Sequence, residues 1–161
     1  NKNLIAYDRD ADLIYRPRNI SKAYRQGAEL SLKYQGAENF SADLSYILQK
    51  TENRETGNEL TYAPRHTFKL TLKYTLSRTL TKFEAIFRAK SAHYGDLENS
   101  DADKLDAYHR TDLKIIQPFT YQSLSSQVFV HFQNLFDNDF EFHHGYPDDG
   151  FKLTGGLTVN F

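Results

Sequence analysis

Hydrophobic and polar residues alternate with a period of two along most of the chain. This period predicts β-strands with two different faces, because successive side chains of a strand point to opposite sides of the sheet. Between Phe68 and Tyr74 the even-numbered residues are apolar, whereas the odd-numbered ones are polar. The same alternation predicts strands over residues 28–34, 40–48, 83–89, 111–115, 126–132 and 151–161, and a short one over 4–7. The pattern therefore predicts an all-β fold of about eight strands.

Ile86 and Phe129 depart from this alternation. Ile86 occupies a polar position of its strand, and Phe129 shares a face with Gln127 and His131 instead of the neighbouring valines. The pattern therefore leaves both orientations of the strand that contains Phe129 open. No segment has apolar residues spaced three and four apart, so no amphipathic helix is predicted.

The connections between the predicted strands alternate between short and long. Short turns surround Gly36, Arg78 and Tyr121, whereas residues 51–65, 95–107 and 137–150 form long polar connections. In an antiparallel up-and-down meander, alternate connections fall at opposite ends of the sheet. One end is therefore expected to carry tight turns and the other large loops, an asymmetry typical of outer-membrane barrels.

Alternation alone does not tell which face meets water. A soluble β-sandwich or a lipocalin-like barrel would show the same pattern with its apolar rows turned inward. Aromatic residues near predicted strand ends favour the membrane barrel, in which such residues form interfacial girdles; they are Tyr34, Tyr46, Tyr62, Tyr74, Tyr94 and Phe161. Charges of both signs in the polar rows also suit a water-filled lumen. The membrane barrel is favoured, and the soluble barrel remains the alternative.

Composition excludes several other classes of protein. The 161 residues carry a formal net charge of -1 and show no basic cluster, which argues against binding to nucleic acid. The absence of cysteine excludes disulfides, thiolate metal sites and cysteine nucleophiles. No apolar run approaches the ~20 residues of a membrane-spanning helix. The chain also lacks a glycine-rich phosphate loop and a Gly-x-Ser-x-Gly elbow, so no enzymatic activity and no cofactor are predicted.

Potential metal ligands gather in two of the long connections. The last one contains Glu141, His143, His144, Asp148 and Asp149. Adjacent side chains point apart on an extended backbone, so His143 and His144 are not expected to bind one metal ion together. A solvated loop that contacts cargo is therefore favoured, and a transition-metal site is not. Asp101 and Asp103 are weaker candidates for a calcium site, because their connection lacks the spacing of an EF-hand. A hydrated loop, or one that divalent ions bridge to lipopolysaccharide, is the favoured interpretation.

The start of the chain indicates a piece of a longer polypeptide. It opens at Asn1 without an initiator methionine or a leader segment. The first alternating stretch, Leu4–Tyr7, is also shorter than the ~9 to 11 residues of a membrane-spanning strand.

Residues 134–161 resemble the C-terminal signature of TonB-dependent outer-membrane receptors. The matching features are an NLFD motif at Asn134–Asp137, a GYP-type turn at Gly145–Pro147 and the terminal Phe161. An upstream stretch resembles the family's opening of a descending strand through Asn19, Lys22, Ala23, Gly27 and Glu29.

This resemblance implies a specific architecture. Residues 1–161 would form the C-terminal segment, about the last eight strands, of a 22-stranded transmembrane β-barrel. The plug domain and the N-terminal strands of the barrel would lie outside this segment. The connection over residues 137–150 would be extracellular, and the short turns would be periplasmic.

The resemblance also implies transport across the outer membrane of a Gram-negative bacterium. The receptor would take up a metal chelate, namely a ferric siderophore, cobalamin or haem, and TonB would act through the plug. The candidate cargo contacts are His143, His144, Tyr146, Asp148 and Asp149. Leu157, Val159 and Phe161 would form the signal read by the barrel-assembly machinery, and lipid and lipopolysaccharide would surround the wall. The alternative is a self-contained eight-stranded outer-membrane barrel with a structural or adhesive role.

Overall fold

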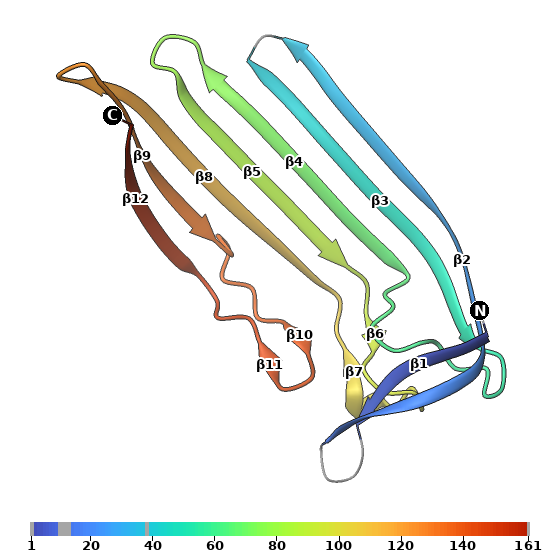
Figure 1. Cartoon of the computed structure of the whole chain (residues 1–161). Coiled ribbons are helices and arrows are strands. Elements are labelled where there is room, and N and C mark those ends of the chain that lie inside the picture. Colours follow the sequence, from blue (N-terminus) through green and yellow to red (C-terminus); the bar gives the residue numbers. More distant parts are fainter. Residues whose placement is uncertain (1, 10–13, 38, 161) are drawn as a thin grey trace.

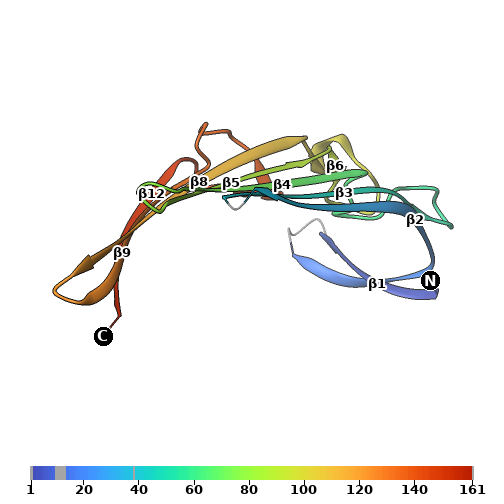
Figure 2. The same ribbon diagram turned by 90° about the horizontal axis from the view of Figure 1, so that it is seen from above.

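Eight strands form one antiparallel sheet in the computed structural model, which describes residues 2–9, 14–37 and 39–160 (Figure 1). They are β1 (Lys2–Arg9), β2 (Tyr15–Ala37), β3 (Phe40–Asn53), β4 (His66–Leu76), β5 (Thr81–Lys90), β8 (Tyr108–Tyr121), β9 (Leu124–Gln133) and β12 (Lys152–Asn160). Each strand pairs with its neighbours in this order, which confirms the up-and-down meander. Seen from above, the sheet is curved, and β1 bends away from the plane of the other strands (Figure 2).

Four further strands and one short helix lie within the connections. β6 (His93–Tyr94) pairs with β7 (Lys104–Leu105), and β10 (Glu141–His143) pairs with β11 (Tyr146–Pro147). A 3-10 turn covers Asp101–Asp103. The described part of the chain has no helix whose length and apolar character would let it cross a membrane.

Strand register places the predicted apolar positions in continuous rows across one face of the sheet. Leu70 of β4 lies opposite Leu44 of β3 on one side and Phe87 of β5 on the other. Many of these side chains are exposed, as Leu32 (53%) and Leu157 (63%) illustrate. Among the described residues, only Ile20, Ala23 and Leu105 are buried hydrophobic residues. The sheet thus presents an apolar face with no second layer packed on it, as a lipid-facing wall does.

The polar face accommodates Ile86 and Phe129, which break the alternation. Ile86 lies opposite Thr71 and Asp112. Phe129 lies opposite Gly156, where an added Cβ would come within 2.6 Å of the phenyl ring. The ring therefore covers Gly156, and the Lys114 ammonium lies 4.7 Å from the ring centroid. The glycine explains how a large side chain fits on the polar face, and Val128 and Val130 keep their places on the apolar one.

The sheet is open. Among the described strands, β1 and β12 are the two edges, and each pairs with one neighbour only. A self-contained eight-stranded barrel would require pairing between these two strands, because closure leaves no edge. The observed topology therefore does not match that alternative.

The two ends of the sheet differ as the connection lengths predict. Short turns join β2 to β3, β4 to β5 and β8 to β9 at the upper end in Figure 1. Three long connections lie at the lower end: loop A (residues 54–65), loop B (91–107) and loop C (134–151). Tyr62 and Tyr94, which were predicted to lie near strand ends, belong to loops A and B and precede β4 and follow β5 respectively. Phe161 lies outside the described residues.

Candidate functional site

Loops A and B are joined by hydrogen bonds that converge on Asn99. The Asn99 side chain accepts from the Glu59 N–H (2.6 Å) and donates to the Glu59 carbonyl oxygen (3.0 Å). It also donates to the carbonyl oxygen of Asp96 at 3.3 Å. Asn99 has a φ of 56°, a left-handed conformation that asparagine tolerates better than most residues. A further bond between the two loops runs from the Asn58 side-chain amide to the Leu97 carbonyl oxygen (2.9 Å).

Loop C reaches this junction through its two histidines. The His143 ring packs edge-on against the Tyr62 ring of loop A, with centroids 4.5 Å apart. The His144 Nδ1 atom lies 3.8 Å from the Glu141 carboxylate and 3.9 Å from the Asp103 carboxylate of loop B. All three loops therefore contact one another at the same end of the sheet.

His93 of loop B lies beside Tyr62. It is buried, since only 5% of its surface is exposed. Burial lowers the pKa of the His93 imidazole, and the nearby Lys90 and His143 lower it further. Its Nδ1 atom lies 3.1 Å from the Ser91 carbonyl oxygen, so the neutral ring donates through Nδ1. Its ring also lies 6.3 Å from that of Tyr62.

Asn134, the first residue of the NLFD motif, closes the base of loop C. It is fully buried and has a φ of 48°. Its side chain donates to the Asn138 carbonyl oxygen (2.9 Å) and to the Asp148 carboxylate (3.0 Å), and accepts from the Asn138 N–H (3.1 Å). Its own N–H donates to the Asp112 carboxylate of β8 at 3.0 Å. Asparagine suits this position because its short amide side chain can bond to all these partners and because it tolerates a positive φ.

The last residue of the motif, Asp137, fixes the other side of this base. Its carboxylate accepts from the Phe151 N–H at 2.7 Å, immediately before β12 begins. Its own N–H donates to the Asn134 carbonyl oxygen at 2.9 Å. The Leu135 N–H adds a bond to the Thr111 carbonyl oxygen of β8 at 2.8 Å. The NLFD segment is therefore a structural corner that ties loop C to β8 and β12.

Charged side chains of β5 and β8 connect this corner to the strands of the wall. Asp112 accepts from Arg88 Nη1 (2.5 Å) and from Arg110 Nε (2.8 Å), and Arg110 Nη1 donates to Asp148 at 2.9 Å. The Asp112 and Asp148 side chains are each 8% exposed, so two carboxylates are buried against two guanidinium groups. Removal of one partner would leave an uncompensated charge, and such networks hold their geometry firmly.

The five predicted cargo contacts lie in three different places in the structure. His143, His144 and Tyr146 lie on the β10–β11 hairpin, and Tyr146 is 66% exposed. Asp148 belongs to the buried network at the base of the loop. Asp149 forms an exposed ion pair with Lys152, whose hydrogen bond and charge lower the pKa of the Asp149 carboxyl.

Asp101 and Asp103 lie in the 3-10 turn of loop B. Within the part of the chain that the structure describes, no three His, Asp or Glu side chains are grouped in a way that could hold a metal ion.

An aromatic cluster beside loop C was not predicted from the sequence. Tyr108 stacks on Phe140 with centroids 4.2 Å apart, and Phe142 packs edge-on against Phe140 at 5.0 Å. A cavity of about 400 Å³ opens between loops B and C; its lining includes Lys104, Asp106, Asp139, Phe140, Glu141 and His144. The cavity offers the Phe140 ring, hydrogen-bonding groups and charge to a ligand at the loop end. Alternating aromatics at 140 and 142 were the available signal in the sequence.

Replacing Asn99 with alanine is expected to loosen the junction of loops A and B. The change removes three hydrogen bonds and places alanine at positive φ, which together cost about 2 kcal/mol. Limited proteolysis should therefore show faster cleavage within loop A. Asn99→Gly is the matched control for backbone conformation and should be cleaved at a rate between those of the wild type and Asn99→Ala. Equal cleavage rates in all three proteins would contradict the role given to Asn99.

The chain is similar to known proteins in sequence and in fold. The family model described as "TonB dependent receptor-like, beta-barrel" matches residues 1–135. No curated protein matches the sequence. Among solved structures, the copper transporter OprC has a TM-score of 0.74 at 17% identity, over 99% of this chain and 27% of its own.

Two siderophore receptors are similar in the same way. A mutant of the ferric enterobactin receptor PfeA from Pseudomonas aeruginosa has a TM-score of 0.67 at 22% identity, over 97% of this chain and 27% of its own. The ferric yersiniabactin uptake receptor FyuA from Yersinia pestis has a TM-score of 0.68 at 18% identity, over 91% of this chain and 25% of its own. At these identities the likeness shows the fold, and the chain spans about a quarter of each of these proteins.

Proposed function

Because this chain belongs to the TonB-dependent receptor β-barrel family, we propose that it supplies wall and loops to an outer-membrane receptor that takes up a metal chelate. The similar structures named above are a copper transporter and receptors for ferric chelates. These structures favour transport over catalysis as the function, and they favour iron or copper over other metals as the metal of the cargo. Within the chelates considered from the sequence, a ferric siderophore is favoured over haem and cobalamin.

We further propose that residues 1–161 are the C-terminal segment of a 22-stranded barrel in a Gram-negative outer membrane. The open edges at β1 and β12 support pairing with further strands, because an exposed edge in a membrane would leave backbone groups unsatisfied. Loops A, B and C would face the exterior, and TonB would act through a plug outside this segment. Leu157, Val159 and Phe161 would be read by the barrel-assembly machinery; the first two are exposed on the apolar face of β12.

Cargo binding is assigned to the surface where loops B and C meet. The observation that carries this proposal is the contact of all three loops at one end of the wall, beside the 400 Å³ cavity. His143, His144 and Tyr146 are the proposed contacts on the hairpin, with Asp149 at its exposed edge. Asp148 would contribute by holding the loop in place through Arg110.

Uptake of radiolabelled ferric siderophores by cells that express the full-length receptor tests this function. Uptake is expected to require TonB. The double variant His143→Ala/Tyr146→Ala is expected to weaken cargo binding about tenfold, as the loss of two contacts does. Lys82→Ala, at the short-turn end of β5, is the control and should bind as the wild type does. Uptake without TonB, or unchanged binding by the loop variant at equal surface expression, would contradict the proposal.

A further inference from the structure

A hollow lies on the polar face of the sheet, next to the short turn that joins β2 to β3. It has a volume of about 600 Å³ and is bordered by the ends of β2 and β4 and the starts of β3 and β5. The polar residues of its lining are Gln35, Asn39, Ser41, Lys73, Thr75 and Lys82. Ser41 lies opposite Lys73, and Thr75 lies opposite Lys82, so these four side chains share one face. We call this site the turn-end hollow.

The lining of the turn-end hollow suits an oxygen anion. Lys73 and Lys82 are both exposed, and neither forms an ion pair with any residue that the structure describes. Ser41 and Thr75 supply hydroxyl groups beside the two ammonium groups, and Gln35 supplies an amide N–H. All of these groups can donate hydrogen bonds, and two of them carry a positive charge.

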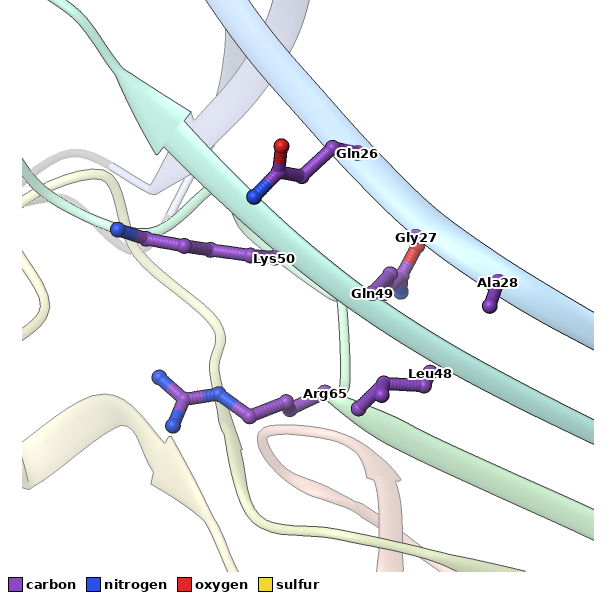
Figure 3. Close-up of a pocket in the computed structure, with 7 residues that line it drawn as sticks. All are labelled: Gln26, Gly27, Ala28, Leu48, Gln49, Lys50 and Arg65. Atoms are coloured by element: carbon purple, nitrogen blue, oxygen red, sulfur yellow. The ribbon is translucent and has the colours of Figure 1, made fainter.

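A hollow beside loop A differs in this respect. Lys50 and Arg65 border it (Figure 3). Glu52 lies 3.5 Å from Lys50, and Glu59 lies 2.9 Å from Arg65. These two cations therefore have carboxylate partners within the chain, whereas the lysines of the turn-end hollow keep their charge for a ligand.

The polar face that leads from the loops to the turn-end hollow is cationic. Arg88 and Arg110 lie opposite each other on β5 and β8, and both bind Asp112. Further cations on this face of β4, β5 and β8 are Lys69, Lys73, Lys82, Lys90 and Lys114. In these three fully described strands the second carboxylate of the face, Glu84, lies opposite two of these lysines. A wall with an excess of positive charge attracts anions along its length.

We propose that the turn-end hollow is a transient site for an anionic ferric chelate that leaves the receptor toward the periplasm. Lys73 and Lys82 would bind its carboxylate or catecholate oxygens, and the hydroxyls of Ser41 and Thr75 would donate hydrogen bonds to the same oxygens. Ammonium groups bind an anion as exposed point charges and hold it weakly, and a transport path needs a site that releases its ligand. The inference rests on the proposed function, which puts the polar face in the lumen and the short turns in the periplasm.

Chemical labelling of the purified full-length receptor in detergent tests the site directly. Lysines are acetylated with and without a ferric tris-catecholate, which is an anion, and the modified residues are counted by mass spectrometry. Excess chelate is expected to slow the acetylation of Lys73 and Lys82 at least about threefold, because mass action leaves fewer of these lysines free. Lys50 is the internal control and should react at the same rate in both samples.

A neutral ferric trihydroxamate distinguishes binding of charge from binding of any chelate, and it should protect neither lysine. Equal protection by the two chelates, or no protection by the anionic one, would overturn the proposal. Lysines 73 and 82 that are already unreactive without chelate would also overturn it, since a carboxylate of the plug would then fill the hollow.

Uptake of the radiolabelled ferric tris-catecholate by cells tests the role of the site in transport. The variant Lys73→Gln/Lys82→Gln is expected to lower the uptake rate about threefold or more and to keep the wild-type Kd at the cell surface, since it removes positive charge only after capture. The matched control Lys50→Gln/Arg65→Gln should change neither quantity. Wild-type uptake by the first variant, or uptake without protection of the lysines, refutes only this site. Protection in a receptor that takes up no chelate refutes only the proposed transport function.

Discussion

Replacement of Asn134 with alanine is expected to open the base of loop C. The substitution removes three side-chain hydrogen bonds from a fully buried position and takes one partner from Asp148. It also places alanine at a φ of 48°, which costs about 1 kcal/mol. The sum is about 3 to 4 kcal/mol, because each buried bond contributes about 1 kcal/mol.

Hydrogen exchange of loop C amides in the full-length receptor measures this effect. The informative N–H groups are those of Asn138, Asp148 and Phe151, which bond to Asn134, Phe140 and Asp137 respectively. Their exchange should accelerate at least about 100-fold in Asn134→Ala, since local opening free energy sets the rate.

Asn134→Gly separates the side chain from the backbone conformation. Glycine adopts positive φ without strain, so this variant should be about 1 kcal/mol less destabilised than the alanine variant. Exchange in strand β4 is the internal control and should not change in either variant. Unchanged exchange in loop C of Asn134→Ala would show that the NLFD corner does not hold the loop.

Much of the wall was predictable because a strand has a fixed period. Alternation placed Leu70 on one face and Lys69 on the other without any knowledge of their partners. Connection lengths likewise placed the short turns and the long loops at opposite ends. The first half of β2 was missed because Arg16, Pro17 and Arg18 interrupt the alternation, although that stretch pairs with β1.

The loop end was less accessible to sequence reasoning. In the sequence, Asp112 is one charged residue among several in the polar rows, yet it is the acceptor for Arg88, Arg110 and the Asn134 N–H. These partners come from separate segments, and a period of two specifies a face without specifying a partner. The short β10–β11 hairpin has no alternation long enough to be recognised. The NLFD motif was recognised by resemblance, whereas its physical reason became visible only through its hydrogen bonds.

Replacement of Leu70 with lysine is expected to destabilise the barrel strongly if the apolar face meets lipid. Leu70 lies within β4 and between Leu44 and Phe87, so an ammonium group there would enter the apolar face. A lysine near the bilayer midplane costs about 2 to 4 kcal/mol. The matched variant Lys69→Leu changes the neighbouring residue on the polar face and should shift stability by less than about 1 kcal/mol.

Chemical unfolding of the full-length receptor from lipid vesicles measures both variants, and fluorophores at the same two positions test the orientation independently. A probe at residue 70 should be quenched by a lipid-soluble quencher, and a probe at residue 69 by a water-soluble one. Because β4 alternates strictly, the two positions must give opposite results. The reverse pattern of quenching, together with a larger loss of stability for Lys69→Leu than for Leu70→Lys, would mean that the apolar rows face inward, as in a soluble barrel.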